Sequence, residues 1–196
     1  MSINSAGDRV AIGAHLNGGT GTQAGHVRVY QYSNSSWSQL GSDIDGEAAG
    51  DNFGYSVSMN SDGDRVAIGA HLNDGTASDA GHVRIYEYSN SSWSQLGIDI
   101  DGEAASDYSG NSVSMYSAGD RVAIGGHAND GADTDAGHVR VYSIPITVQT
   151  TTYVPDDNFE QALIDLGYDD VLNDSVLTAN ISSITSLDIT LSLIHI

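Results

Sequence analysis

The chain has 196 residues, no cysteine and a formal net charge of −20. All six basic residues are arginine. Because the net charge is strongly negative, the surface repels phosphate backbones and anionic lipid headgroups, and we expect no nucleic-acid partner. The absence of cysteine excludes disulfides and thiolate metal sites. No run of about 18 apolar residues is present and Met1 is not followed by a signal segment, so we also expect no membrane insertion.

A repeat with a spacing of 56 residues organises most of the chain. The string "RVAIGAHLN" at 9–17 returns at 65–73 and, as "RVAIGGHAN", at 121–129. The strings "GHVRVY" or "GHVRIY" and "SSWSQLG" recur at the same spacing, the former at Gly25, Gly81 and Gly137, the latter around Trp37 and Trp93. By this register the chain starts partway through a strand. Tandem units of this length are typical of repeat architectures.

Four short runs in the complete unit, each bounded by turn residues, predict strands at about 54–60, 65–71, 82–89 and 93–100. No stretch before residue 157 has the apolar period of a helix. We therefore predict an all-β fold of tandem four-stranded β-propeller blades, a partial and open propeller of about three blades. A β-solenoid or a sandwich of duplicated hairpins is the alternative.

Each repeated string carries a glycine in its middle, where glycine weakens a strand. We expect His15 to lie opposite His26 in an antiparallel hairpin, which places Gly13 opposite Arg28. In this register the glycine leaves room for the guanidinium. The same arrangement is predicted for two further pairs, Gly69 with Arg84 and Gly125 with Arg140.

Three motifs then carry a family resemblance: "FGYSV" at 53–57, "DGDRVAIGAH" at 62–71 and "GHVRIY" at 81–86. Together they resemble the FG-GAP repeat of integrin α-subunit propellers and related bacterial surface proteins, over about residues 1–143. The resemblance implies an extracellular or cell-surface location. Because a closed ring needs about four to eight blades, it also implies further blades of the same parent chain as partners. The sequence departs from the family at Ser109, which replaces phenylalanine, and where histidine replaces the proline of Gly-Ala-Pro, at His15, His71 and His127.

A second module follows the repeats, which we assign to residues 1–146. Residues 147–156 are expected to be a linker, and 157–190 a helical cap and a first leucine-rich repeat. Asp157 is a suitable N-cap and Gly167 a stop for a short α-helix. The apolar spacing after it fits a leucine-rich repeat at Ile181, Ile184, Leu187 and Ile189. This part resembles the start of leucine-rich domains in secreted bacterial surface proteins, and 191–196 reads as a non-native tail.

Two repeated features of the sequence could hold a metal ion: the histidines and the turn before the second strand. The histidines of the repeats recur in every unit and match no standard zinc spacing, so we expect them to be scaffold. FG-GAP propellers carry calcium in the loop before the Gly-Ala-Pro strand, and here Asn60, Asp62 and Gly63 match that pattern. Ser58 and Val66, however, occupy its outer carboxylate positions. Because calcium needs six to eight oxygens, a tight turn is the preferred interpretation.

The loop between the second and third strands varies while the scaffold does not. It reads "NGGTGTQAG" at 17–25, "NDGTASDAG" at 73–81 and "NDGADTDAG" at 129–137. Asp130, Asp133 and Asp135 could converge on calcium with a Kd of about 10⁻⁴ to 10⁻³ M, as in extracellular modules. A solvated acidic loop is the alternative, so the predicted cofactor is either none or calcium.

The sequence offers no catalytic motif of the common kinds, such as a Gly-x-Ser-x-Gly elbow or a Walker loop. Two recurring groups of carboxylates are expected to be solvated turn residues rather than catalytic pairs: Asp43, Asp45 and Glu47, then Asp99, Asp101 and Glu103. We therefore predict a non-catalytic extracellular binding or adhesion module that recognises a protein or glycan. The alternatives are the accessory propeller of a secreted carbohydrate-active enzyme and a structural spacer.

Overall fold

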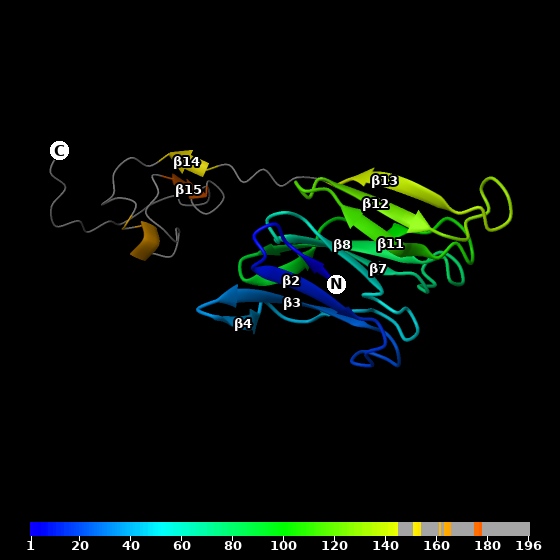
Figure 1. Cartoon of the computed structure of the whole chain (residues 1–196), viewed down its shortest axis with the longest axis horizontal. Coiled ribbons are helices and arrows are strands. Elements are labelled where there is room, and N and C mark those ends of the chain that lie inside the picture. Colours follow the sequence, from blue (N-terminus) through cyan, green and yellow to red (C-terminus); the bar gives the residue numbers. More distant parts are fainter. Residues whose placement is uncertain (145–150, 154–160, 162, 166–174, 178–196) are drawn as a thin grey trace, which may run out of the picture. The chain divides into compact units, whose positions relative to one another are not determined.

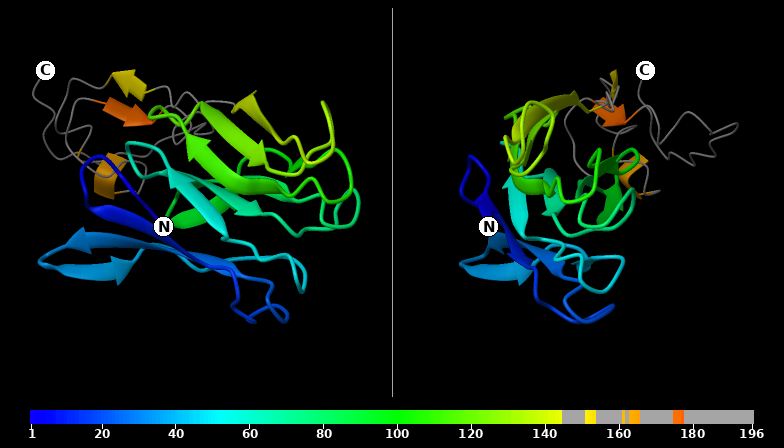
Figure 2. Two further views of the ribbon diagram at one scale, coloured as in Figure 1. Left: turned by 45° about the vertical axis from the view of Figure 1, so that its right-hand side comes forward. Right: turned by 90° about the vertical axis from the view of Figure 1, so that its right-hand side faces the viewer.

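A computed structural model describes residues 1–144, 151–153, 161, 163–165 and 175–177. The chain divides into two compact units, Met1–Ile146 and Thr147–Ile196. Three antiparallel sheets make up the first unit and follow one another in chain order, each against the next (Figures 1 and 2). We call them the first, second and third sheets.

The first two sheets share one topology, and the third has three strands within the described residues. The first sheet has the order β1-β2-β3-β4, and β5 also pairs with β3. The first sheet comprises β1 (Ser2–Ile3), β2 (Arg9–Ala14), β3 (His26–Ser33), β4 (Ser36–Gln39) and β5 (Ile44–Asp45). The second comprises β6 (Ser56–Met59), β7 (Arg65–Ala70), β8 (His82–Ser89), β9 (Ser92–Gln95) and β10 (Ile100–Asp101). The third comprises β11 (Ser109–Met115), β12 (Arg121–Gly126) and β13 (His138–Ser143).

The predicted strands are close to those observed, except the fourth. The run at 93–100 is broken into β9 and β10, which both pair with β8. Between them the amide of Leu96 donates to the carbonyl of Ile85 at 2.8 Å, and Gly97 has a positive φ of 80°. The interruption is therefore a bulge in one strand, because the hydrogen bonding to β8 resumes beyond it.

The predicted hairpin register is wrong by one residue. Ala14, not His15, lies opposite His26, so Gly13 pairs with Val27 and Arg28 pairs with Ile12. A shift of one residue moves every side chain to the other face of the sheet. The guanidinium therefore does not lie across the glycine.

The glycine instead allows two sheets to approach each other. A Cβ added at Gly13 would overlap the carbonyl of Gly54, just before β6 of the next sheet, and Gly54 itself has a φ of +86°. Gly69 meets Gly110 in the same way across the second and third sheets. The repeated glycine thus marks a backbone-to-backbone contact between sheets, a reason for glycine in a strand.

Two apolar clusters fill the spaces on either side of the second sheet. One joins the first and second sheets: Ala11, Val27, Val29, Ile44, Phe53, Met59, Val66, Ile68 and Ala70. The other joins the second and third: Ala67, Val83, Ile85, Met115, Val122, Ile124 and Ile144. Because successive side chains of a strand point to opposite faces, β7 contributes to both clusters.

In the second unit, β14 (Thr151–Tyr153) pairs antiparallel with β15 (Ser175–Leu177). The segment 147–156, expected to be a linker, therefore contains a strand, in keeping with its β-branched and aromatic residues. Residues 161 and 163–165 are helical, inside the predicted helix, and Leu163 is buried. The predicted leucine-rich positions and the tail 191–196 lie outside the described residues. In the described part of the chain no helix has the length and apolar character to cross a membrane.

Candidate functional site

A group of charged side chains bridges the first and second sheets. It consists of Glu47, in the loop after β5, together with His82 and Arg84 of β8 and Asp99 just before β10. We call these four residues the inter-sheet cluster. Arg84 donates from Nε and Nη2 to Asp99 at 2.9 and 2.7 Å, and its Nη2 also donates to Glu47. The guanidinium therefore ties a loop of one sheet to the next sheet.

His82 lies at the bottom of the inter-sheet cluster. Its side chain is 1% exposed, and its Nδ1 lies 3.8 Å from Glu47 Oε1 and 3.7 Å from Asp99 Oδ2. These distances exceed hydrogen-bond reach, and Nδ1 is buried without a partner. Burial, with a smaller contribution from Arg84, lowers the pKa of His82 although two carboxylates stand nearby. The imidazole is therefore neutral at pH 7.

Asn73 links Glu47 of the cluster to a further carboxylate, Asp51. The buried side-chain amide of Asn73 donates to Glu47 Oε1 and to Asp51 Oδ2, both at 2.9 Å. Burial raises the pKa of Asp51. Asn73 thus holds Glu47 from the side opposite Arg84, so the carboxylate has a fixed orientation.

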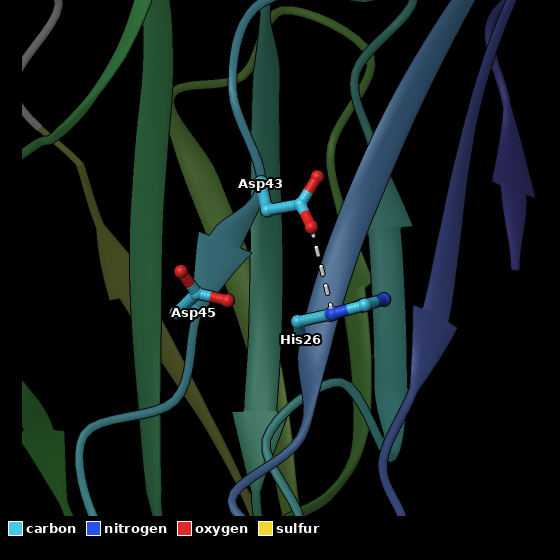
Figure 3. A group of neighbouring side chains, drawn as sticks. All are labelled: His26, Asp43 and Asp45. Carbon is cyan, nitrogen blue, oxygen red and sulfur yellow. Dashed lines mark ion pairs between the residues drawn. The ribbon is translucent and has the colours of Figure 1, made fainter. Parts of the chain in front are cut away.

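The first sheet contains a counterpart of this group at the same repeat positions. Figure 3 shows the imidazole of His26 facing the carboxylate of Asp43, with Asp45 on the neighbouring strand, and the His26 Nδ1 to Asp43 Oδ2 distance is 3.7 Å. Arg28 donates two hydrogen bonds of 2.8 Å to Asp43 and lowers the pKa of that carboxyl to about 2. His26, Asp43 and Asp45 have their ligand atoms within 4.8 Å of one another, as do Glu47, His82 and Asp99.

The expectation that these carboxylates are solvated turn residues holds for Glu47, which is 42% exposed, but it left out the charged partners of Asp43, Asp99 and Glu47. Each accepts hydrogen bonds from an arginine of β3 or β8. The signal was present in the sequence, because the arginine and the aspartate recur together at one separation, Arg28 with Asp43 and Arg84 with Asp99. Of the repeated histidines, which were expected to be scaffold, His26 and His82 are buried.

A row of aromatic rings crosses all three sheets at the end where β2, β7 and β12 finish. Successive ring centroids lie 5.3, 4.0, 6.3 and 5.0 Å apart. We call this set the ring row, and its members in order are His15, Tyr55, His71, Tyr108 and His127. Sequence reasoning missed it, because the two tyrosines do not occupy equivalent positions of the repeat.

Two features of the ring row bear on its chemistry. Tyr55 is 47% exposed between two histidines, so its ring is open to solvent. Burial, followed by repulsion from His127 and His15, lowers the pKa of His71, while Asp79 acts in the opposite direction. The central histidine of the row is therefore uncharged at neutral pH.

The three aspartates singled out as calcium ligands lie in the exposed loop 129–137. Asp130 accepts from the backbone amide of Asp135 at 2.8 Å, and Asp133 accepts from the amide of Thr134 at 2.8 Å. They are not among the groups of described residues whose ligand atoms lie within 4.8 Å of one another. The structure thus uses two of the three carboxylates to shape the loop, and calcium binding there stays a prediction.

The turn before β7, compared above with a calcium loop, is built by Asn60. Its Oδ1 accepts from the amide of Arg65 at 2.9 Å and its Nδ2 donates to Asp64 at 2.7 Å, while Gly63 has a φ of +72°. Asn4 repeats this arrangement before β2. The tight turn predicted for "SMNSDGDRV" is therefore confirmed.

Comparison with known proteins supports one part of the resemblance. A family model described as the FG-GAP repeat matches residues 43–86. The match runs from the loop before β5, through β6 and β7, into β8, so it spans the boundary between the first and second sheets. No curated protein matches the chain. This segment is thus similar to FG-GAP repeats and lies in an all-β fold of antiparallel sheets.

Proposed function

We propose that the chain is a non-catalytic binding or adhesion module of a larger secreted or surface-anchored bacterial protein, and that it recognises a protein or glycan. FG-GAP repeats suggest a propeller-like extracellular module, and the match at 43–86 supports this class. In this proposal the sheets are propeller blades and further blades of the same parent chain complete the ring. The strong negative charge fits an extracellular location, because it keeps the surface soluble at high salt.

The observation that carries the proposal is the contrast between a constant frame and variable loops. The loops 17–25, 73–81 and 129–137 have equal lengths and are closed by equivalent backbone hydrogen bonds of 2.9, 2.9 and 3.0 Å. Their other residues differ, from glycine and threonine in the first to three aspartates in the third. Variable side chains on a rigid frame are typical of recognition surfaces.

The ring row lies beside these loops, because each of its histidines stands two residues before the first residue of a loop. Tyrosine and histidine offer an apolar face and polar atoms on the same side chain, a combination enriched at binding surfaces. Leu16, the residue after His15, is 59% exposed. Together with the exposed ring of Tyr55, it gives this end of the sheets an apolar surface for contact with a ligand. Sugar rings and aromatic protein side chains both stack on such faces.

A binding screen against a printed array of neutral and acidic glycans and immobilised extracellular proteins tests this proposal. We expect Tyr55→Ala to weaken the binding found by at least tenfold. A tenfold change in Kd corresponds to a binding free energy of about 1.4 kcal/mol, which is the size of loss seen at interface hot spots. The matched control is Tyr116→Ala, because Tyr116 is 55% exposed but lies at the end of β11, away from the ring row. Equal losses in the two variants, or no binding to any probe, would contradict the proposal.

A further inference from the structure

The inter-sheet cluster holds three potential metal ligands around one buried nitrogen. One ligand atom each from His82, Glu47 and Asp99 lies within 4.8 Å of the other two. His82 Nδ1 is 3.8 Å from Glu47 Oε1 and 3.7 Å from Asp99 Oδ2. His82 is 1% exposed and its Nδ1 has no hydrogen-bond partner. A buried polar nitrogen without a partner is costly, so a structure that keeps one calls for an explanation.

We propose that Glu47, His82 and Asp99 bind a divalent transition-metal ion of the zinc type at the boundary between the first and second sheets. In tetrahedral zinc sites the ligand bonds are about 2.0–2.2 Å, which places ligand atoms about 3.3–3.6 Å apart. The observed separations from His82 Nδ1 exceed this by only a few tenths of an ångström. Small side-chain rotations therefore bring each carboxylate to bonding distance of an ion held by His82 Nδ1, and the ligand atoms of the two carboxylates lie within 4.8 Å of each other.

The set of ligands indicates the kind of metal ion. One imidazole and two carboxylates favour zinc over calcium or magnesium, which bind through oxygen.

Neighbouring groups hold the two carboxylates in place. Arg84 donates to the other oxygen of Glu47, Oε2, and to both oxygens of Asp99, while Asn73 donates to Glu47 Oε1. Such outer contacts orient metal ligands, and their loss typically costs 10–100-fold in affinity. The guanidinium charge acts against a cation, but Glu47, Asp99 and the nearby Asp51 outweigh it.

The bound ion would join the first and second sheets. Glu47 belongs to the loop that follows β5 of the first sheet, whereas His82 begins β8 and Asp99 precedes β10 of the second sheet. Binding to the folded state alone raises its stability by mass action. The site is separate from the ring row, so it stands or falls independently of the proposed recognition function. Three protein ligands leave one position of a tetrahedral ion for water.

Calorimetric titration of the full chain with zinc sulfate at neutral pH tests the site. We expect saturable binding that Glu47→Gln weakens by at least tenfold, together with a rise in Tm on adding zinc that this variant loses. The matched control is Glu103→Gln, because Glu103 is the repeat equivalent of Glu47 and pairs with Arg140 on the third sheet. No zinc binding by the unmodified chain, or equal weakening in the two variants, would overturn the proposal.

A second measurement does not depend on any variant. In ¹⁵N NMR spectra of the imidazole nitrogens, zinc should shift the Nδ1 resonance of His82 more than that of any other histidine. Calcium at the same concentration should leave it unchanged, since the site lacks the six to eight oxygens that calcium prefers. A zinc-induced shift confined to the exposed His127 would assign the binding to the surface and overturn the site.

Discussion

The second and third sheets contain nearly the same sequence in different surroundings. Val83 and Ile85 of β8 are 0% and 2% exposed, whereas their equivalents in β13, Val139 and Val141, are 70% and 68% exposed. The strands have the same internal register, with Gly69 opposite Val83 and Gly125 opposite Val139. The repeat therefore specifies an apolar sheet face, and burial of that face depends on whether another sheet lies against it.

The arginines at the start of the second strands show the same contrast. Arg65 of β7 has a side chain 5% exposed and donates from Nη1 to the carbonyl of Gly119 in the third sheet at 3.1 Å. Its equivalent Arg121 is 60% exposed. Arg65 thus contributes to the contact between sheets, as the buried valines do, because it links the second sheet to a turn of the third. The comparison of equivalent positions separates contacts within a sheet from contacts between sheets.

The repeated glycine should give the largest difference between the two sheets. A methyl group at Gly69 would overlap the carbonyl of Gly110 in the third sheet, whereas at Gly125 it would meet only the hydroxyl of Ser112 at 2.5 Å. We expect Gly69→Ala to lower the free energy of unfolding by about 3 kcal/mol, because backbone atoms cannot move aside as side chains do. Gly125→Ala should cost less than about 1 kcal/mol, since alanine also has the better strand propensity. Urea unfolding followed by tryptophan fluorescence measures both.

A further control separates crowding from a general loss of glycine. Gly18 has no atom closer than 3.7 Å to an added Cβ and no positive φ, and its repeat equivalents are aspartates. Gly18→Ala should therefore leave the urea midpoint unchanged. Equal midpoints for Gly69→Ala and Gly125→Ala would show that contact between sheets is not the reason for the glycine.

The valines of the third strands should give the next largest difference. Val83→Ala removes two methyl groups from a cluster that joins the second and third sheets, and we expect a loss of about 1–3 kcal/mol. Val139→Ala changes an exposed side chain and should stay within about 0.5 kcal/mol. Thermal unfolding of both variants checks this. Similar losses would mean that Val139 is covered in solution.

The repeat made most of the fold of residues 1–143 predictable. The 56-residue spacing and the turn residues around Asn60 placed the strands, except the interrupted fourth one, to within about two residues, as is usual for element ends. The hairpin register was not predictable in this way, because the sequence does not show where a loop of nine to eleven residues begins. That error hid the contact between Gly13 and Gly54, which depends on a neighbouring sheet.

The candidate site was less predictable than the fold. The pairing of Arg84 with Asp99 could have been predicted from the repeat. The contact of Glu47 with Arg84 joins two successive repeats, so it can be predicted only when the packing of the sheets is known. The ring row is harder still, because Tyr55 and Tyr108 reach equivalent places from different repeat positions. Contacts between repeats are set by geometry that a single unit does not contain.

A pH-dependent stability should distinguish the buried histidine of the second sheet. The pKa of His82 is lowered by burial, so the unfolded chain binds its proton first as pH falls through about 6.5. Stability should therefore decrease below about pH 7, by at most about 1.4 kcal/mol per pH unit for this group. His71 contributes in the same direction. We expect His82→Gln to flatten the fall in urea midpoint between about pH 7 and pH 5.

The control for this measurement is His138→Gln, because His138 is the equivalent residue of β13 and is partly exposed. It should keep the slope of the unmodified chain. The pKa of Asp99 is lowered as well, by the hydrogen bond from Arg84, but its contribution is lost only at more acidic pH, below about 4. An unchanged slope in His82→Gln would show that burial of this imidazole does not set the pH dependence.

The smallest effect is expected at the outer edge, where the first and second sheets can be compared at their tryptophans. Trp93 of β9 donates from Nε1 to the carbonyl of Leu40 in the first sheet at 2.8 Å, and it packs on the core between the two sheets. Its equivalent Trp37 is 47% exposed and stacks only on Tyr32 of its own sheet among the described residues. Trp93→Phe keeps the aromatic body but loses the donor, so we expect a cost of about 1 kcal/mol, whereas Trp37→Phe should be neutral. The difference should appear in urea midpoints, monitored by circular dichroism because each variant loses a fluorophore. If the two variants lose equal stability, the hydrogen bond to Leu40 does not fasten the outer edges of the sheets together.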